Sequence, residues 1–377
     1  MARQVPERSN RRAKKKAPFI IKFLSVILAA LFLCACGLGA YAWNIWEKIT
    51  NKPNTFWPPQ IFVTPNSDDL THDDDPFNDS PVDEEGNTEP VEAADPNGNS
   101  FVTQLLSEGY KYNQDLITIG FYGVDVLKER GNMGTRTDAN LFLVVNTRTN
   151  ELSMISVPRD TWTTVPKMNK DGKITSYVKA RFNTAMVYGH GPSNYGYQNA
   201  NKAYSMLTGG INVSSYIGFD MDGMMAIVDT LGGIPITMDV DFSSVGLKIK
   251  KGETATMNGS QTLVYVRARH GVNGGGDYGR MARQQKVAKI ILESIKTRLK
   301  KNPLFVTDLY GSVKPYMDTN LTLEQMGVLA VQLKDADLST IKNYTVKTKG
   351  ANKNGASVEV YDEAALKELI RDVYFIK

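Results

Sequence analysis

Cysteine is almost absent from this 377-residue chain, and the two that occur, Cys34 and Cys36, lie inside one apolar run near the N-terminus. The remainder of the chain carries no disulfide and must fold on its hydrophobic core alone. Histidine is also scarce, with three residues in all, which argues against a histidine-ligated zinc site. No G-x-x-x-x-G-K-[ST], G-x-S-x-G or H-E-x-x-H pattern occurs, so the commonest nucleotide-binding, serine-hydrolase and zinc-protease signatures are missing.

Positive charge is missing from residues 53–110, where Asp and Glu are frequent and Pro, Asn, Ser and Gly fill much of the rest. Such a segment cannot bury enough apolar surface to fold. We therefore expect residues 47–113 to form a disordered acidic stalk. The net charge of +4 hides this asymmetry, because residues 114–377 are basic and have the apolar runs of a single folded domain.

The N-terminus has the pattern of a membrane anchor. Residues 1–22 are rich in Lys and Arg, and an uncharged run follows over residues 23–44. Because about 20 apolar residues span a bilayer, we expect a single transmembrane helix over residues 23–46. The positive-inside rule then leaves residues 1–22 in the cytoplasm and exports the rest of the chain. A signal peptide cleaved after Ala-Tyr-Ala at 40–42 is the alternative.

An exported domain without cysteine is more typical of a Gram-positive bacterium than of a eukaryotic secretory route. Outside the cell, nucleic acid is a poor partner for the basic domain. We therefore expect a single-pass protein of the cell membrane whose folded domain is extracytoplasmic.

The folded domain shows strands and helices interleaved along the chain. Buried strands are expected at 116–122, 139–146, 152–157, 215–219, 234–240 and 261–268, and helices at 199–207, 221–231, 278–300, 323–333 and 362–373. This mixture predicts an α/β fold with a central mixed sheet flanked by helices (α/β/α).

Residues 263–285 are the segment most informative about function. Arg267 and Arg269 lie two apart in an apolar run with the character of a strand, so we expect them on one side of it. Arg280 and Arg283 lie three apart at the start of a helical pattern and share a helix face. A glycine-rich loop joins the two elements, so that four guanidinium groups can converge near a helix N-terminus, where anions are favoured.

A phosphate or pyrophosphate is the natural ligand of such a cluster, because arginine grips it in bidentate fashion. A single arginine more often lies on a solvated face or pairs with an acid, but here the only nearby acid is Asp277. The G-x-G-x-x-G at 274–279 is weak as a dinucleotide fingerprint because no clean βαβ unit surrounds it. We interpret it as an anion-binding loop.

Two aspartates form a second candidate site. The strand at 116–122 leads into Asp125, and Asp138 immediately precedes the strand at 139–146. Carboxylates that meet at a strand end, together with phosphate oxygens and water, suit Mg²⁺. Turn or capping roles are the alternative for both. Arg159 and Asp160 follow the strand at 152–157, either as a salt bridge that closes the loop or as part of the site.

Taken together, these motifs resemble those of the LytR-CpsA-Psr family. In order, they are Gly-x-Asp at 123–125, Arg-Thr-Asp at 136–138, Ser-Val-Pro-Arg-Asp-Thr at 156–161, Arg-x-Asn-x-Ala at 181–185, Leu-Gly-Gly-Ile at 231–234, Tyr-x-Arg-x-Arg at 265–269 and Asp-x-x-Arg-x-x-Arg-Gln-Gln at 277–285. The chain departs from the family pattern after Asp125, where Val126 and Leu127 replace Ser-Arg.

The resemblance implies an extracytoplasmic, Mg²⁺-dependent phosphotransferase, with Mn²⁺ as an alternative metal. Its donor would be a polyprenyl-pyrophosphate-linked glycopolymer such as teichoic acid or capsule, and its acceptor peptidoglycan. Asp125 and Asp138 would hold the metal. Arg159 and Gln284 would support the site. The residues that would clamp the pyrophosphate are Arg136, Arg267, Arg269, Arg280 and Arg283.

Two other functions stay open from the sequence. The same clamp could serve a polyprenyl-pyrophosphate hydrolase that uses water as the nucleophile, or a non-catalytic regulator that binds anionic wall polymer. A polyprenyl chain also needs an apolar cleft, which the helices at 221–231 and 287–295 could line. Apolar stripes at helical spacing are, however, more often ordinary core.

Overall fold

A computed structural model describes residues 47, 57, 100–125, 135–269, 276–302, 305–353 and 355–377. The chain divides into two compact units, Met1–Lys52 and Pro53–Lys377, and only residue 47 of the first is described. The expected cytoplasmic segment and transmembrane anchor at 1–46 therefore lie outside the described residues. Within the described ranges, no helix is both long and apolar enough to cross a bilayer.

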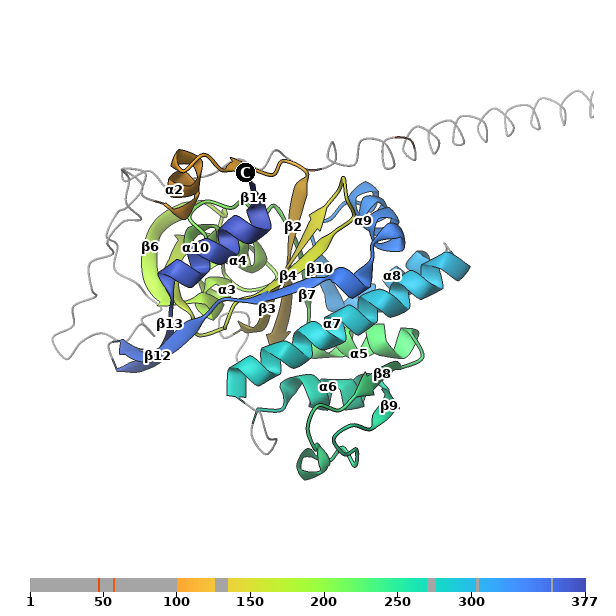
Figure 1. Cartoon of the computed structure of the whole chain (residues 1–377). Coiled ribbons are helices and arrows are strands. Elements are labelled where there is room, and N and C mark those ends of the chain that lie inside the picture. The colour runs from red at the N-terminus through yellow and green to blue at the C-terminus, as the bar shows by residue number, and fades with distance from the viewer. Residues whose placement is uncertain are drawn as a thin grey trace, which may run out of the picture. The chain divides into compact units, whose positions relative to one another are not determined.

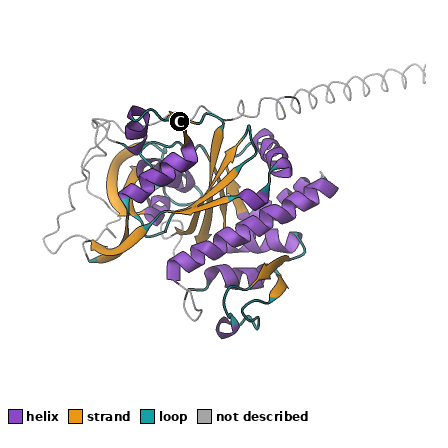
Figure 2. Cartoon of the chain, viewed as in Figure 1, coloured by secondary structure: helices purple, strands orange, loops and turns teal. Residues whose placement is uncertain are grey.

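A six-stranded mixed sheet, in the order β10–β7–β2–β3–β4–β11, forms the centre of the second unit (Figures 1 and 2). Its strands are β2 Leu116–Asp125, β3 Arg136–Asn146, β4 Leu152–Ser156, β7 Ser215–Phe219, β10 Met317–Thr319 and β11 Lys342–Thr345. β2–β7 and β4–β11 pair in parallel, and the remaining neighbours are antiparallel. The predicted α/β architecture with a central mixed sheet is confirmed.

Helices and small two-stranded sheets surround this centre. The helices are α2 Phe101–Ser107, α3 Ala185–Tyr188, α4 Gly196–Leu207, α5 Met221–Thr230, α6 Gly259–Arg267, α7 Gly276–Lys301, α8 Phe305–Val313, α9 Leu323–Asp335 and α10 Glu363–Tyr374. The two-stranded sheets pair β1 Lys111–Tyr112 with β14 Phe375–Ile376, β5 Trp162–Met168 with β6 Ile174–Arg181, β8 Ile234–Thr237 with β9 Thr254–Met257, and β12 Thr348–Lys353 with β13 Ala356–Tyr361.

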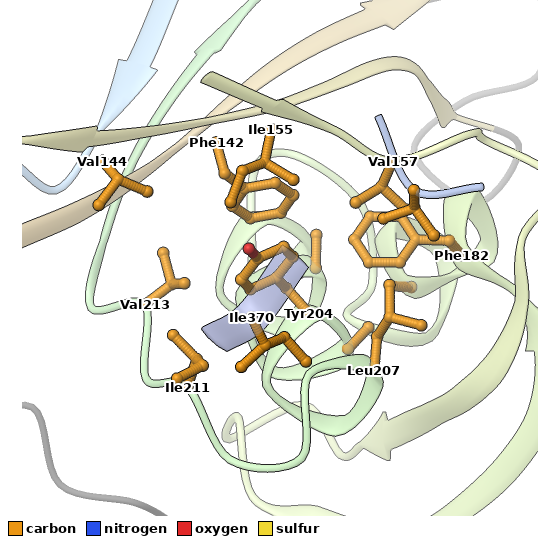
Figure 3. Packing of buried hydrophobic residues seen from close by; sticks show 14 of the residues in the cluster. Phe142, Val144, Ile155, Val157, Phe182, Tyr204, Leu207, Ile211, Val213 and Ile370 are labelled. Atoms are coloured by element: carbon orange, nitrogen blue, oxygen red, sulfur yellow. The ribbon is translucent and has the colours of Figure 1, made fainter. Parts of the chain in front are cut away.

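One face of the sheet is packed solid. Successive side chains of a strand point to opposite faces, so Phe142 and Val144 of β3 share one face. There they meet Tyr204 of α4 and Ile370 of α10, all within one buried cluster (Figure 3). The rings of Phe142 and Tyr204 stack with centroids 3.7 Å apart. This cluster therefore holds the sheet in place from one side, and its other face is left for the site.

A second buried cluster supports the part of the fold that carries residues 263–285, called the arginine-rich segment below. Val228 of α5, Ile236 of β8, Tyr265 of α6 and Val287 of α7 belong to it, and Phe242 packs against Tyr265 with ring centroids 4.9 Å apart. The relative placement of α5, α6 and α7, visible in Figure 1, therefore rests on a core separate from the first.

The strand predicted over residues 261–268 is wrong: residues 261–267 belong to helix α6, and Ala268 is its C-cap. Asn258 caps the helix by accepting a hydrogen bond from the Gln261 backbone, and the Gln261 side chain accepts one from the Asn258 backbone in return. The buried residues Thr262, Tyr265 and Val266 follow helical spacing. Local β-branched residues favoured a strand, but the capping box and the burial of one helix face determine the outcome.

Disorder was predicted for residues 47–113, and this is wrong for residues 100–113. α2 and β1 lie there, and Val102 and Leu105 of α2 are buried in the first core cluster. Ser100 caps α2 by accepting a hydrogen bond from the Thr103 backbone. The folded domain therefore begins at least fourteen residues before the predicted boundary at residue 114.

Candidate active site

The other face of the sheet is hollow, with a cavity of about 570 Å³ between it and the helices α5 to α9. Phe121, Leu141 and Met154 project into it from β2, β3 and β4, one residue out of step with the packed face. Its charged and amide lining residues are Asp138, Arg159, Asp220, Arg267, Arg269, Arg280 and Gln284. Almost all the other lining residues are apolar, so the cavity combines a large apolar region with a strongly basic one.

Helix α7 lines both the basic and the apolar region, one after the other along its length. Arg280 and Gln284 line the cavity in the first turns of the helix, and Val287, Ile291 and Leu299 line it further along. With a rise of 1.5 Å per residue, the distance from Arg280 to Leu299 is roughly 28 Å. The cavity is therefore elongated, basic near the start of α7 and apolar toward its end. Residues from 221–231 and 287–295 line it, as the lipid-cleft hypothesis requires.

A bulge in the sheet presents Asp138 to the cavity. Gly123 pairs with Ala139 and Val124 pairs with Thr137, which leaves Asp138 as the extra residue of β3. Such a bulge redirects a side chain and is frequent beside active sites. Arg159 Nη1 donates to Asp138 Oδ1 at 2.8 Å, and its Nε donates to Asp160 Oδ2 at 3.2 Å.

The electrostatic balance at Arg159 favours its charged form. Burial alone lowers the pKa of Arg159. The hydrogen bond to Asp138 and the negative charges of Asp160, Asp138 and Asp277 outweigh burial, so the pKa lies above its ordinary value. Arg159 therefore forms a salt bridge with Asp160 and also lines the cavity.

A second arginine group meets at the start of α7. Arg269 Nη2 and Arg280 Nη2 lie 2.8 Å and 3.4 Å from the same Asp277 oxygen. Arg280 is only 5% exposed, and burial lowers its pKa, as does the nearby charge of Arg269, while Asp277 opposes them. The N-terminus of the 26-residue helix α7 adds a partial positive charge. This corner of the cavity is suited to an anion.

Buried donor atoms without a partner strengthen that conclusion. Within the described part of the chain, Arg269 Nε and Arg280 Nε are buried and make no hydrogen bond. A buried unsatisfied donor costs about 1–3 kcal/mol, and more when charged, unless a ligand or water completes it. An anion with several oxygens, such as a phosphate, would satisfy these donors.

Gln284 and Gln285 have different positions despite being adjacent. Gln284 lines the cavity. Gln285 is buried and donates to Ser156 Oγ at 2.9 Å and to the Tyr344 carbonyl at 2.8 Å. It thus ties α7 to the ends of β4 and β11, which holds the start of the helix against the sheet.

The remaining predicted residues lie around the cavity in different ways. Arg267 ends α6 and lines the cavity, with Nη1 2.8 Å from Met221 Sδ. Because α6 is a helix, Arg267 and Arg269 are not side by side on one strand. Arg136 lies on β3, opposite Asp125 in the pairing with β2. Among the described residues that line the cavity, neither Arg136 nor Arg283 is included.

Arg283 lies behind the cavity wall. It is 5% exposed, and its Nε donates to the Tyr265 carbonyl at 3.0 Å while Nη2 donates to the Ala268 carbonyl. Its guanidinium also lies over the rings of Phe242 and Tyr265. Arg283 therefore secures the C-terminal end of α6, from which Arg267 and Arg269 project.

The donor set available for a metal is small. Asp138 contributes a partly exposed carboxylate, and Asp125 lies on the neighbouring strand one pair beyond Val124, although its side chain is outside the described residues. The described residues contain no group of three His, Cys, Asp or Glu side chains that could hold a metal. Two carboxylates plus phosphate oxygens fit Mg²⁺, which binds few protein groups and keeps waters.

Sequence reasoning missed two features of this site. It noted Asp277 only as an insufficient counter-charge, whereas the carboxylate contacts two arginines at once. It also missed the sheet residues that line the cavity. The continuous apolar run of β3 at 141–145 could have indicated that both faces of the strand are buried, but not that one of them borders a cavity.

An elongated apolar cavity with a cluster of arginines in its basic region is suited to an amphiphilic anion. The LytR_cpsA_psr family model matches residues 82–373. The chain therefore belongs to the LytR-CpsA-Psr family, as the sequence motifs predicted.

Named relatives lie within the same family. A polyisoprenyl-teichoic acid–peptidoglycan teichoic acid transferase TagU from Bacillus subtilis is 29% identical over 263 residues, covering 69% of this chain and 78% of the relative. A protein of the same name from Enterococcus faecalis is 25% identical, with coverage of 67% and 77%.

Solved structures share the fold. The protein gbs0355 from Streptococcus agalactiae superposes with a TM-score of 0.56 at 25% identity, covering 71% of this chain and 89% of that one. A structure of TagT bound to LIIa-WTA superposes with a TM-score of 0.54 at 20% identity, covering 70% and 92%.

Proposed function

We propose that this protein transfers a glycopolymer from a polyprenyl-pyrophosphate carrier to a hydroxyl group of peptidoglycan. The observation that carries the proposal is the cavity itself, in which an apolar lining along α7, roughly 18 Å from Val287 to Leu299, leads to a cluster of arginines with unsatisfied donors. A lipid pyrophosphate likewise has a long apolar chain that ends in an anionic group. The transferase names of the relatives agree with it.

The chemistry is a phosphoryl transfer. The acceptor hydroxyl oxygen bonds to the phosphorus that carries the sugar, and the bond from that phosphorus to the bridging oxygen breaks. The polyprenyl monophosphate leaves with the bonding electron pair, and the hydroxyl proton is lost to a base. The product is a phosphodiester between polymer and peptidoglycan.

The arginines provide electrostatic stabilisation at each stage. Arg269 and Arg280 would hold the phosphates at the start of α7, and Arg159 and Arg267, which line the same cavity, would add two further guanidinium groups. Fixed cations in a water-poor cavity stabilise the charge that develops on the leaving phosphate. Gln284 is a further donor within reach of this region.

Mg²⁺, or Mn²⁺ in its place, would be held by Asp125 and Asp138 and would supply charge neutralisation at the phosphate oxygens. Asp138 keeps one oxygen on Arg159 and would offer its second oxygen to the metal. The proton acceptor for the hydroxyl would be one of these carboxylates.

The location of the protein is part of the proposal. Residues 23–46 would anchor it in the cell membrane with residues 1–22 in the cytoplasm. The catalytic domain would then lie outside the cell, where both a lipid-linked polymer and peptidoglycan are available.

A reconstituted reaction tests the proposal. The full-length protein in detergent micelles is incubated with a polyprenyl-pyrophosphate-linked sugar and a short peptidoglycan oligomer, with Mg²⁺ or with a chelator, and products are followed by mass. We expect a sugar-phosphate adduct on the oligomer that requires the metal. Release of lipid phosphate without an adduct would indicate a hydrolase, and binding without turnover would indicate a regulator.

Blocking the apolar region should separate lipid binding from folding. Ala288 lines the cavity on α7, so Ala288→Trp would place an indole where the prenyl chain lies. We expect roughly tenfold or greater loss of transfer, since each displaced CH₂ forfeits about 0.8 kcal/mol of burial. Ala282→Trp is the matched control, because Ala282 is exposed on the same helix. Equal activity of the two variants would contradict a lipid-filled cavity.

A further inference from the structure

The only acid in the arginine-rich segment, Asp277, occupies the place expected for a ligand phosphate. One of its oxygens lies 2.8 Å from Arg269 Nη2 and 3.4 Å from Arg280 Nη2. Asp277 belongs to the first turn of α7, so it also interacts favourably with the helix dipole. A carboxylate in this position gives the two arginines an anion when no substrate is bound.

Asp277 satisfies these arginines incompletely. Arg269 Nε, Arg269 Nη2 and Arg280 Nε are buried and have no hydrogen-bond partner among the described residues, so Asp277 meets Arg269 as an ion pair without a hydrogen bond. The pyrophosphate of a lipid-linked donor presents four non-bridging oxygens and two negative charges, whereas the carboxylate presents two oxygens and a single charge. The phosphate can therefore make bonds to the arginines that Asp277 leaves unmade.

The influence of Asp277 extends beyond its two contacts. Its charge is among those that raise the pKa of Arg159, which also lines the cavity, and it acts on Arg280 in the same direction. Arg159 is itself held by Asp138. In the free protein, three of the cavity's arginines are thus paired with carboxylates before any phosphate arrives.

We propose that Asp277 is an internal competitor of the pyrophosphate: it occupies Arg269 and Arg280 in the free enzyme, yields them to the donor, and takes them back as the lipid monophosphate leaves. The inference rests on the proposed function and adds to it a residue that sets affinity and product release. A permanently uncompensated arginine pair would bind substrate and product phosphates alike too tightly, which lowers turnover.

The Asp277→Asn variant isolates the charge from the geometry. Asparagine keeps an oxygen that can accept from both guanidinium groups, but it removes the negative charge that repels a phosphate. Asp115→Asn is the matched control, since Asp115 pairs with Arg148 at 2.6 Å on an exposed surface and does not line the cavity. It changes the net charge of the protein by the same amount.

The probes are farnesyl pyrophosphate, for the donor head, and farnesyl monophosphate, for the product head. Their affinities are measured by calorimetry on the full-length protein in neutral detergent. We expect both to bind roughly tenfold more tightly to Asp277→Asn, with the gain shrinking at high salt. The control should bind like the wild type. In turnover, the variant should show a lower KM, a lower kcat and stronger inhibition by the monophosphate.

Thermal unfolding gives a readout that does not depend on catalysis. Without ligand, Asp277→Asn should unfold at a lower temperature than the wild type, because Arg280 loses its counter-charge in a buried position. Farnesyl pyrophosphate should then raise the unfolding temperature of the variant by more than it raises that of the wild type. If the variant does not fold, Asp277→Glu serves instead, and we expect it to retain the competition and bind like the wild type.

The outcomes distinguish this inference from the proposed function. Weaker or unchanged binding of farnesyl pyrophosphate by Asp277→Asn, with normal binding by the wild type, would overturn the competitor role alone and make Asp277 an orienting residue. Weaker binding of farnesyl pyrophosphate by Asp277→Glu than by the wild type would likewise overturn the competitor role alone. Failure of the wild type to bind either farnesyl phosphate would overturn both the inference and the proposed function.

Discussion

Replacing Arg280 by alanine is expected to lower the rate of glycopolymer transfer by about 10²–10³-fold, the usual effect of removing one preorganised donor from a developing anion. Arg280 is the arginine of the cavity with the least exposure, 5%, and it retains a buried Nε without a partner among the described residues. Burial already lowers its pKa, so the protein holds this charge at a cost in solvation. Because this buried guanidinium is poorly solvated, its interaction with a bound anion is strong.

The kinetic parameters show how Arg280 acts. If it stabilises the transition state, kcat and kcat/KM fall together, whereas a rise in KM with unchanged kcat would limit its role to ground-state binding. Arg280→Lys should recover only part of the loss, because lysine keeps the charge but not the planar fork. Arg371→Ala is the matched control, as Arg371 is on α10 and pairs with Glu368 and Asp372. Wild-type kinetics in Arg280→Ala would remove this residue from the site.

The sequence could indicate the chemistry of this site better than its shape. Arginine spacing, the Asp–Arg pairs and the order of motifs depend on residue identity, and Asp138, Arg159, Arg267, Arg269 and Arg280 do line one cavity. The cavity itself arises because the helices α5 to α9 stand off one face of the sheet while α4 and α10 pack tightly against the other. That difference is a property of tertiary packing, which a periodic apolar stripe does not reveal.

Local signals failed where long-range contacts decide the structure. Residues 263–266 have the β-branched and aromatic character of a strand, yet the cap at Asn258 and the burial of Thr262, Tyr265 and Val266 make them a helix. The β5–β6 hairpin is absent from the predicted strands; Pro166 lies within β5, where proline is tolerated because the sheet has only two strands. Asn199 of α4 donates to the Pro166 carbonyl at 2.8 Å, which fixes this hairpin to the core.

Arg283 illustrates the difference between membership of a motif and contact with a ligand. The sequence placed it in the pyrophosphate clamp with Arg280, three residues earlier. In the structure its guanidinium turns toward the end of α6 and donates to the carbonyls of Tyr265 and Ala268. The last carbonyls of a helix lack partners within the helix, and a cation there is favourable.

Arg283→Ala is therefore expected to destabilise the folded domain by about 3 kcal/mol, since two charged hydrogen bonds and the stacking over Phe242 and Tyr265 are lost together. In a domain of this size the unfolding temperature without ligand should fall by roughly 6–10 °C. Urea unfolding of the full-length protein measures the free energy directly. Arg283→Lys keeps the charge but offers a single donor group, so its free energy of unfolding should lie between those of the wild type and Arg283→Ala.

Activity separates the two roles that Arg283 could have. If it positions α6, transfer measured well below the unfolding temperature should fall because Arg267 and Arg269, on either side of Ala268, lose their fixed direction. Guanidinium ion at low millimolar concentration should then restore part of the activity and part of the stability by filling the vacated site. A variant with wild-type stability but a raised KM for the lipid pyrophosphate would instead place Arg283 on the phosphate, because direct binding affects affinity without supporting the helix end.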